Sequence, residues 1–121
     1  MAGYRELNVW QKSMTLVEEV YYLVKLLPKE ETYGLSDQMR RAAVSIPSNI
    51  AEGHGRSSAK EFSRFLLIAQ GSNAELETQL ELCVRLQFLT VQQTSIAVSL
   101  CTEVGKMLRT LIRQLALPTN N

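Results

Sequence analysis

Apolar residues recur every three or four positions through most of the chain, and polar stretches divide this pattern into four segments. A repeat of this period places one side of a helix against a protein core. The segments predict helices from about Leu7 to Leu27, from Ser36 to Gly53, from Ser58 to Gln87 and from Thr90 to Leu115. Short connections between long amphipathic helices favour antiparallel neighbours. We therefore predict an all-α fold, an antiparallel up-down-up-down four-helix bundle, formed by one domain over residues 1–121.

Residues near the predicted helix ends support these limits. Pro28 ends the first helix, whereas Pro47 lies inside the second, where the apolar period continues from Ile46 to Ile50. We therefore expect one continuous, kinked helix there rather than two helices. The expected N-terminal caps are Ser36, the Ser58/Glu61 pair and the Thr90/Gln93 pair.

Length and charge limit the possible function classes. A chain of 121 residues can bury a core without support from a metal or a disulfide. Its net charge of +1 gives no overall attraction to phosphate, so any nucleic-acid contact must come from a local basic patch. No apolar run has the length of a membrane span and the first residues lack a signal-peptide pattern, so we expect a cytoplasmic protein without membrane contact. Cys83 and Cys101 are expected to be reduced, buried thiols.

The first predicted helix carries two apolar stripes. One contains Leu7, Trp10, Met14, Val17, Tyr21 and Val24, and the other contains Val9, Leu16, Val20, Leu23 and Leu27. Together they are wider than one core contact requires. One interpretation is that the bundle covers one stripe and a neighbouring subunit covers the other, which makes Leu16, Val20 and Leu23 the predicted subunit interface. The alternative is a single broad face packed between two helices of the same bundle.

Polar residues also recur at helical spacing in the second and third predicted helices. They are Gln38, Ser45, Asn49 and Glu52 in the second helix, and Ser72 and Asn73 in the third. An unpaired amide at Asn73, inside an apolar stripe, would cost about 1 to 3 kcal/mol. One interpretation is that these side chains bond to one another and fix the helix register. The other is a polar pocket or subunit junction, in which Glu52 pairs with Arg41 or Arg56 or acts as a general base.

Residue sets typical of enzymes are missing from the sequence. His54 is the sole histidine, and no second imidazole or thiolate stands at metal-ligand spacing from it. Glu52 lacks the partner carboxylates of a diiron bundle. The Gly53-His54-Gly55 segment is too short to be a phosphate-binding loop and has no Gly-Lys-Ser/Thr sequence after it. We therefore predict a protein that is not an enzyme and has no cofactor or metal.

Basic residues form two strips that point to nucleic acid or to an ordinary solvated surface. The first consists of Arg56, Lys60 and Arg64, with Arg40 and Arg41 available from the second helix. The second consists of Lys106, Arg109 and Arg113. No aromatic residues that could stack on bases are interleaved with these strips. The predicted RNA-binding residues are Arg40, Arg41, Arg56, Lys60 and Arg64.

A long motif extends over the second and third predicted helices. It reads Ser-Ile-Pro-Ser-Asn-Ile-Ala-Glu-Gly over residues 45–53 and continues with Ala-Gln-Gly-Ser over residues 69–72 and Glu-Leu-Glu over residues 75–77. The chain resembles the bacterial four-helix-bundle proteins encoded in intervening sequences of 23S ribosomal RNA genes, a family related to the accessory proteins of diversity-generating retroelements. The similarity extends over nearly the whole chain, beginning with Leu-Asn-Val-Trp-Gln-Lys at residues 7–12.

The resemblance implies a non-enzymatic antiparallel bundle that assembles as a homopentamer. It also implies association with ribosomal RNA or the ribosome, for which the local basic strips would supply the contacts. The retroelement relatives bind nucleic acid and a reverse transcriptase through a basic surface, and the near-neutral charge of this chain departs from that pattern. The alternative function is therefore a protein interaction adaptor, including an accessory protein for a reverse transcriptase.

Overall fold

The computed structural model describes residues 3–118 and consists of helices joined by short connections. The long helices are α1 (Asn8–Val24), α2 (Leu35–His54), α3 (Ala59–Arg85) and α4 (Val91–Leu115). Short 3-10 helices at Tyr4–Glu6 and Lys29–Glu31 precede α1 and α2. Residues 1–2 and 119–121, which the predicted domain includes, lie outside the described part of the chain.

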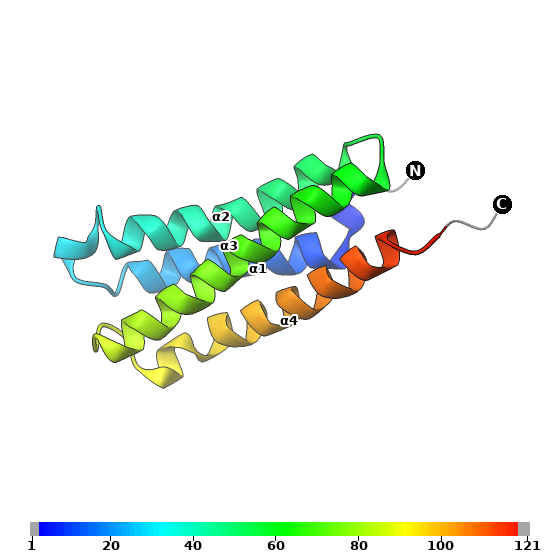
Figure 1. The fold of residues 1–121 in the computed structure, drawn as a ribbon. Helices are drawn as coiled ribbons and strands as arrows, with labels where there is room; N and C mark the ends of the chain where they lie inside the picture. Colours follow the sequence, from blue (N-terminus) through cyan, green and yellow to red (C-terminus); the bar gives the residue numbers. More distant parts are fainter. Residues whose placement is uncertain (1–2, 119–121) are drawn as a thin grey trace.

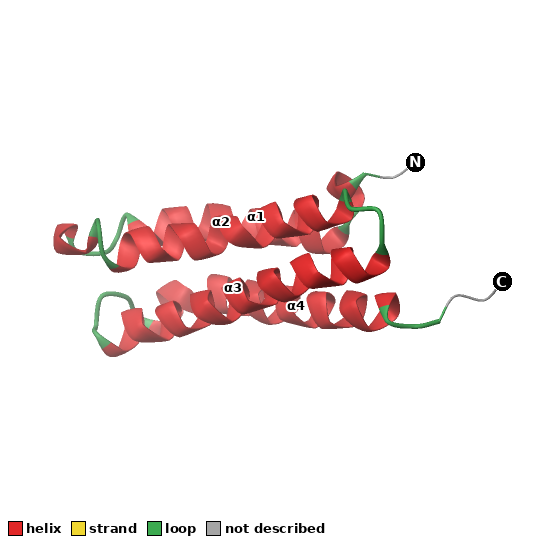
Figure 2. Cartoon of the chain, turned by 45° about the horizontal axis from the view of Figure 1, so that its top comes forward, coloured by secondary structure: helices red, strands yellow, loops and turns green. Residues whose placement is uncertain are grey.

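Successive helices run in opposite directions along a common axis (Figure 1). Figure 2 shows α1 and α2 in one layer and α3 and α4 in the other. Each helix packs against the one before it, and α1 also packs against α4, which closes the bundle. An ion pair of 2.8 Å between Lys12 of α1 and Glu103 of α4 joins these two helices at the surface. The predicted all-α four-helix bundle is confirmed, and its successive helices are antiparallel in Figure 1.

The core lies on the axis between the four helices. Leu16, Val20 and Leu23 are at most 1% exposed within this single chain, where they meet the buried side chains of the other helices. The prediction that they form a subunit interface is therefore wrong, because a neighbouring subunit could not reach them. Burying each such side chain contributes about 1.5 to 3 kcal/mol to folding. The other apolar stripe of α1, which contains half-buried Trp10 and exposed Met14, lies nearer to solvent.

Two of the three predicted caps are present. The Ser58 hydroxyl accepts a hydrogen bond from the Glu61 backbone N–H at 3.1 Å. Thr90 and Gln93 form a complete capping box, in which each side chain accepts from the other residue's backbone N–H. The third prediction is wrong, because Ser36 is buried inside α2 and does not cap it. Instead the Glu31 carboxylate accepts from the Leu35 backbone N–H at 3.1 Å.

The helix ends differ by a few residues from those predicted. α2 continues through Pro47, as expected. α1 ends at Val24, three residues before the predicted limit, and residues 25–27 form turns before Pro28. α3 ends at Arg85 because Gln87 has a φ of 64°, in the left-handed region. This conformation lets the Phe88 backbone N–H donate to the Cys83 carbonyl at 2.9 Å, which closes the end of the helix.

The two cysteines are part of the core and form no disulfide. Burial, assisted by the charge of Glu31, raises the pKa of the Cys83 thiol to about 11. Burial, assisted by Glu77, raises the pKa of Cys101 to about 12. The Cys83 thiol lies 3.6 Å from the Met39 sulfur, to which it donates. Both thiols are therefore protonated at neutral pH and pack as small apolar groups, as predicted.

Candidate nucleic-acid interface

The two predicted basic strips lie at the same end of the bundle. α3 begins at this end and α4 finishes there, because the two helices are antiparallel neighbours (Figure 1). Arg109 and Arg113 of α4 lie beside Gln70 of α3 and line a hollow of about 480 Å³ with it. Lys60 lies in the first turn of α3, at the same end of the bundle, and its side chain is exposed to solvent. The topology thus combines two strips that are about 50 residues apart in the sequence.

Two arginines of the first strip are paired with carboxylates on neighbouring helical turns. Arg56 lies 2.7 Å from Glu52, and Arg64 lies 3.2 Å from Glu61. The hydrogen bond and charge of Arg64 lower the pKa of the exposed Glu61 carboxyl. Exposed pairs of this kind contribute little to folding because solvent screens them, so a stronger anionic ligand can replace either carboxylate.

The remaining cations of the strips are not paired. Among residues 3–118, no ion pair involves Lys60, Lys106, Arg109 or Arg113, and all four side chains are exposed. Acidic residues gather toward the opposite end, where α1 and α3 finish and α2 and α4 begin (Figure 1). That half contains Glu18, Glu19, Glu30, Glu31, Asp37, Glu75, Glu77 and Glu81. A chain with a net charge of +1 therefore has one basic end and one acidic end.

Arg40 and Arg41 lie away from this basic end, so the expectation that they supplement the strip of Arg56, Lys60 and Arg64 is wrong. They lie in the first half of α2, whereas α3 begins beside the last turn of α2, at Gly53. Twelve residues of helix between Arg41 and Gly53 correspond to roughly 18 Å along the axis. Arg41 pairs with Asp37 at 2.9 Å, and Arg40 donates to the Thr32 carbonyl at 3.3 Å.

Phe65 is a functional candidate that the sequence analysis missed. The guanidinium carbons of Arg56 and Arg64 lie over its ring, 4.9 and 4.8 Å from the ring centroid. The ring can approach the end of α2 because residue 53 is glycine: a Cβ atom there would lie 2.6 Å from the Cβ of Phe65. From the sequence we expected no aromatic residue able to stack on bases among the basic strips, and Phe65, half-buried beneath two guanidinium groups, is an aromatic partner of the arginines rather than a surface for bases. A sequence signal existed, since Phe65 directly follows Arg64.

Part of the predicted polar cluster forms a bridge between α2 and α3. The hydroxyls of Ser45 and Ser72 are 2.8 Å apart, and the Asn49 amide donates to the Ser45 hydroxyl at 2.9 Å and to its carbonyl at 2.8 Å. These three side chains are half-buried and satisfy one another. They link α2 to α3 and fix the register of the two helices, which is one of the two interpretations drawn from the sequence.

The other members of the predicted cluster lie elsewhere. Asn73 is buried toward α4, where its amide nitrogen donates to the Cys101 carbonyl at 2.9 Å and its side-chain oxygen has no hydrogen-bond partner among residues 3–118. Glu52 is exposed and pairs with Arg56, one of the two partners proposed for it. Gln38 is exposed on α2. The six residues therefore do not line one pocket, and Glu52 does not lie in an enclosed site suited to a general base.

Two comparisons with known proteins decide the family. Residues 5–110 match the 23S rRNA-intervening sequence protein family. The chain belongs to this family. It is also 31% identical to a protein of unknown function from the S23 ribosomal protein family of Bacteroides thetaiotaomicron, whose crystal structure superposes with a TM-score of 0.81. The alignment covers 87% of this chain and 98% of the Bacteroides chain. No significant similarity to a curated protein sequence was found.

The region matched to the 23S rRNA-intervening sequence protein family contains the Ser45–Ser72 bridge and most of the basic end. Arg113 lies just beyond it.

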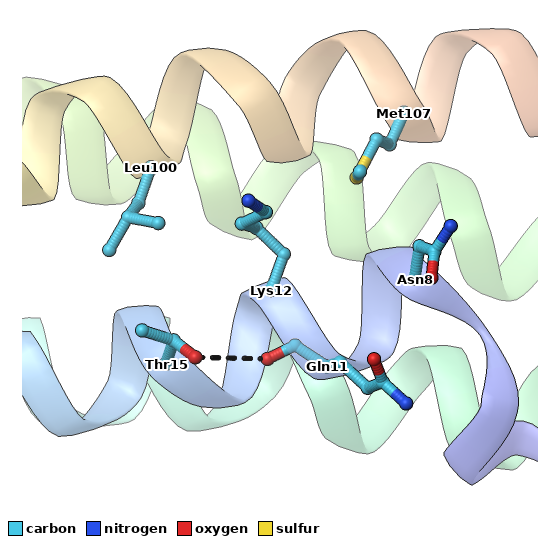
Figure 3. Close-up of a pocket in the computed structure, with 6 residues that line it drawn as sticks. All are labelled: Asn8, Gln11, Lys12, Thr15, Leu100 and Met107. Carbon is cyan, nitrogen blue, oxygen red and sulfur yellow. Dashed lines mark hydrogen bonds between the residues drawn. The ribbon is translucent and has the colours of Figure 1, made fainter.

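Figure 3 shows another hollow of about 470 Å³, between α1 and α4. It is lined by Asn8, Gln11, Lys12, Thr15, Leu100 and Met107, and Thr15 donates to the Gln11 carbonyl at 3.3 Å. These groups include one cation and no carboxylate or imidazole to exchange protons with a substrate.

Within residues 3–118, no group of three or more His, Cys, Asp or Glu side chains is arranged to hold a metal ion. In the same part of the chain, no helix combines the length and apolarity needed to cross a membrane.

Proposed function

We propose that this chain is a non-enzymatic protein that associates with ribosomal RNA or the ribosome through the basic end of its bundle. The observation that carries the proposal is the convergence of the α3 and α4 strips at one end, with Lys60, Lys106, Arg109 and Arg113 exposed and unpaired in the described residues. Such cations bind phosphate by releasing the counterions that surround RNA. The family's relation to 23S ribosomal RNA makes that RNA the first ligand to test.

The charge distribution also gives the interaction a direction. The acidic half of the bundle repels a phosphate backbone, while the basic end attracts it. The protein should therefore approach RNA with the start of α3 and the end of α4 first. This orientation leaves the opposite end, with the α1–α2 and α3–α4 connections, directed away from the RNA.

Titration of labelled 23S ribosomal RNA fragments at several salt concentrations tests this proposal. Neutralising about three phosphates predicts that log K falls with log salt concentration with a slope of about −2 or steeper. A bovine serum albumin titration controls for non-specific effects of the label. The absence of binding at low salt, or binding that salt does not weaken, would contradict the proposal.

We further propose that the chain forms a homo-oligomer, with a pentamer as the expected state, through the outer face of α1 and α2. This face has a hollow of about 340 Å³ lined by apolar residues and one serine: Tyr4, Trp10, Met14, Val17, Val44, Pro47, Ser48 and Ala51. A closed ring needs two different contact surfaces on each subunit. Leu82 and Leu86, which are 41% and 54% exposed on and just after α3, provide a second apolar surface away from the basic end.

Light scattering at micromolar protein concentration should give the mass of an oligomer for the wild type. Met14→Glu should lower it to the mass of a monomer, because a charge would be buried in the α1/α2 face, while the helical circular dichroism signal is kept. Val91→Glu is the matched control, since Val91 is 68% exposed at the start of α4 and does not line the α1/α2 hollow. A monomeric wild type would refute the oligomer.

A protein interaction adaptor is the second candidate, including one that serves a reverse transcriptase. The apolar α1/α2 hollow favours it, because the apolar face of an amphipathic helix from a partner protein could occupy the same surface. The two candidates differ in their dependence on Met14 and on salt. RNA association should depend on salt, whereas partner binding in the α1/α2 hollow should depend on Met14 and little on salt.

A further inference from the structure

Arg56 and Arg64 reach the same aromatic ring from different parts of the chain. Arg56 follows the end of α2, and Arg64 lies in the second turn of α3. Their guanidinium carbons are 4.9 and 4.8 Å from the centroid of the half-buried Phe65 ring. Both side chains remain open to solvent, with 44% and 59% of their surface exposed. Two cations are thus held beside one ring at the surface of the basic end.

Close packing at the α2–α3 junction holds Phe65 in place. Phe65 packs on Gly53 so closely that a methyl group at residue 53 would overlap the Phe65 Cβ. The neighbouring aromatic residue, Phe62, contacts His54 edge to face at a centroid distance of 5.5 Å. The ring therefore has a fixed position, and a planar guanidinium over a fixed ring loses few further degrees of freedom when it binds a ligand.

We propose that Arg56, Arg64 and Phe65 form a binding site for an unpaired nucleotide of RNA. This site rests on the proposed RNA association. An arginine stacked over an aromatic ring still presents its N–H groups at the edge and its second face to solvent. The edge can donate to a phosphate, and the free face can stack on a base that is not in a duplex. Phe65 is a positioning residue here, because it acts by holding the two guanidinium groups.

Carboxylates occupy the site in the free protein. Glu52 accepts from Arg56 at 2.7 Å and Glu61 accepts from Arg64 at 3.2 Å. Since both carboxylates are exposed, an incoming phosphate can take their place at the guanidinium edge. The two glutamates therefore compete with RNA for the arginines and weaken its binding. Lys60, Lys106, Arg109 and Arg113 make the general phosphate contacts and do not depend on this exchange.

Binding to one labelled RNA strand, free or annealed to its complement, tests the positioning role. Phe65→Leu should lower affinity for the unpaired strand about tenfold and leave affinity for the duplex unchanged. Phe65→Tyr keeps an aromatic ring at this position and should therefore retain the preference for the unpaired strand. Phe88→Leu, at the opposite end of the bundle, is the matched control and should change neither affinity. The Arg56→Lys/Arg64→Lys variant keeps the charge and the packing of Phe65, so it should lose only the preference for the unpaired strand.

Removal of one competing carboxylate tests the exchange. Glu52→Gln should raise the affinity for the unpaired strand about threefold, because Arg56 is then available to phosphate. Glu81→Gln is the matched control: it breaks an exposed pair of the same spacing, Glu81–Arg85 at 3.0 Å, and adds the same charge at the other end. It should change the affinity less than Glu52→Gln does.

The outcomes separate this inference from the proposed function. If the wild type binds RNA but prefers the duplex or has no preference, or if Phe65→Leu and the double lysine variant keep the preference, the nucleotide site is refuted while the RNA association stands. Equal effects of Glu52→Gln and Glu81→Gln refute the exchange. A wild type that binds no RNA at low salt refutes the proposed function and the site together.

Discussion

The variant Lys60→Glu/Arg109→Glu/Arg113→Glu is expected to bind ribosomal RNA at least about 100-fold more weakly than the wild type, since three phosphate contacts become repulsive. These residues are exposed, form no ion pair within residues 3–118, and lie outside the Phe65 site. Fluorescence anisotropy at fixed low salt measures the loss. The slope of log K against log salt concentration should also become shallower, because fewer counterions are released.

A matched variant at the acidic end separates position from total charge. Lys25→Glu/Lys29→Glu/Arg85→Glu changes the net charge by the same amount and also replaces exposed side chains. Its RNA affinity should fall much less, because these residues lie where α1 and α3 finish. If both triple variants lost the same affinity, the interaction would depend on net charge alone, and the basic end would not be the interface.

Gly53→Ala is expected to lower the free energy of unfolding by about 2 kcal/mol, because overpacking of a close contact strains the structure. The added Cβ would lie 2.6 Å from the Phe65 Cβ and 3.1 Å from the Phe62 ring, so α2 and α3 would have to separate. Thermal unfolding followed by circular dichroism should show a Tm lower by several degrees. Since the change moves Phe65, the preference for unpaired RNA should fall as well.

Gly71→Ala provides the control from the same motif. Gly71 lies within α3 and is exposed, and apart from the adjacent backbone of α3 itself no atom of the described residues lies within 4 Å of the position a Cβ would take. Alanine there should raise the free energy of unfolding by about 0.5 to 1 kcal/mol, since glycine is the poorer helix former. If both variants were equally stable, close packing at Gly53 would not explain why glycine stands at the α2–α3 junction.

The fold could be predicted from the sequence because each helix carries its own apolar period and most caps are local. The stripe that α1 turns to the core could not be predicted in this way. Both stripes of α1 are apolar, and the choice between them depends on the positions of α2 and α4. Packing buries Leu16 and Val20 completely and leaves Met14 40% exposed. Periodicity of one helix does not contain this information.

The candidate site was only partly predictable for a related reason. The α3 and α4 strips were visible as charged residues at helical spacing, but their meeting at one end depends on the antiparallel topology. That topology also excludes Arg40 and Arg41, which the sequence analysis had added to the strip. The cluster on Phe65 requires the turn between α2 and α3 to return Arg56 to the ring. The partner of Asn73 likewise lies on α4, 28 residues away.

Ultraviolet crosslinking in the native cell, followed by mass spectrometry of the crosslinked peptides, tests the proposed RNA association most directly. Ribosomal RNA is expected among the recovered nucleic acids, with crosslinks concentrated in residues 56–65 and 106–113. The acidic end, including residues 25–37 and 75–86, should carry few. Recovery of no RNA, or crosslinks confined to the acidic end, would contradict an RNA interface at the basic end of the bundle.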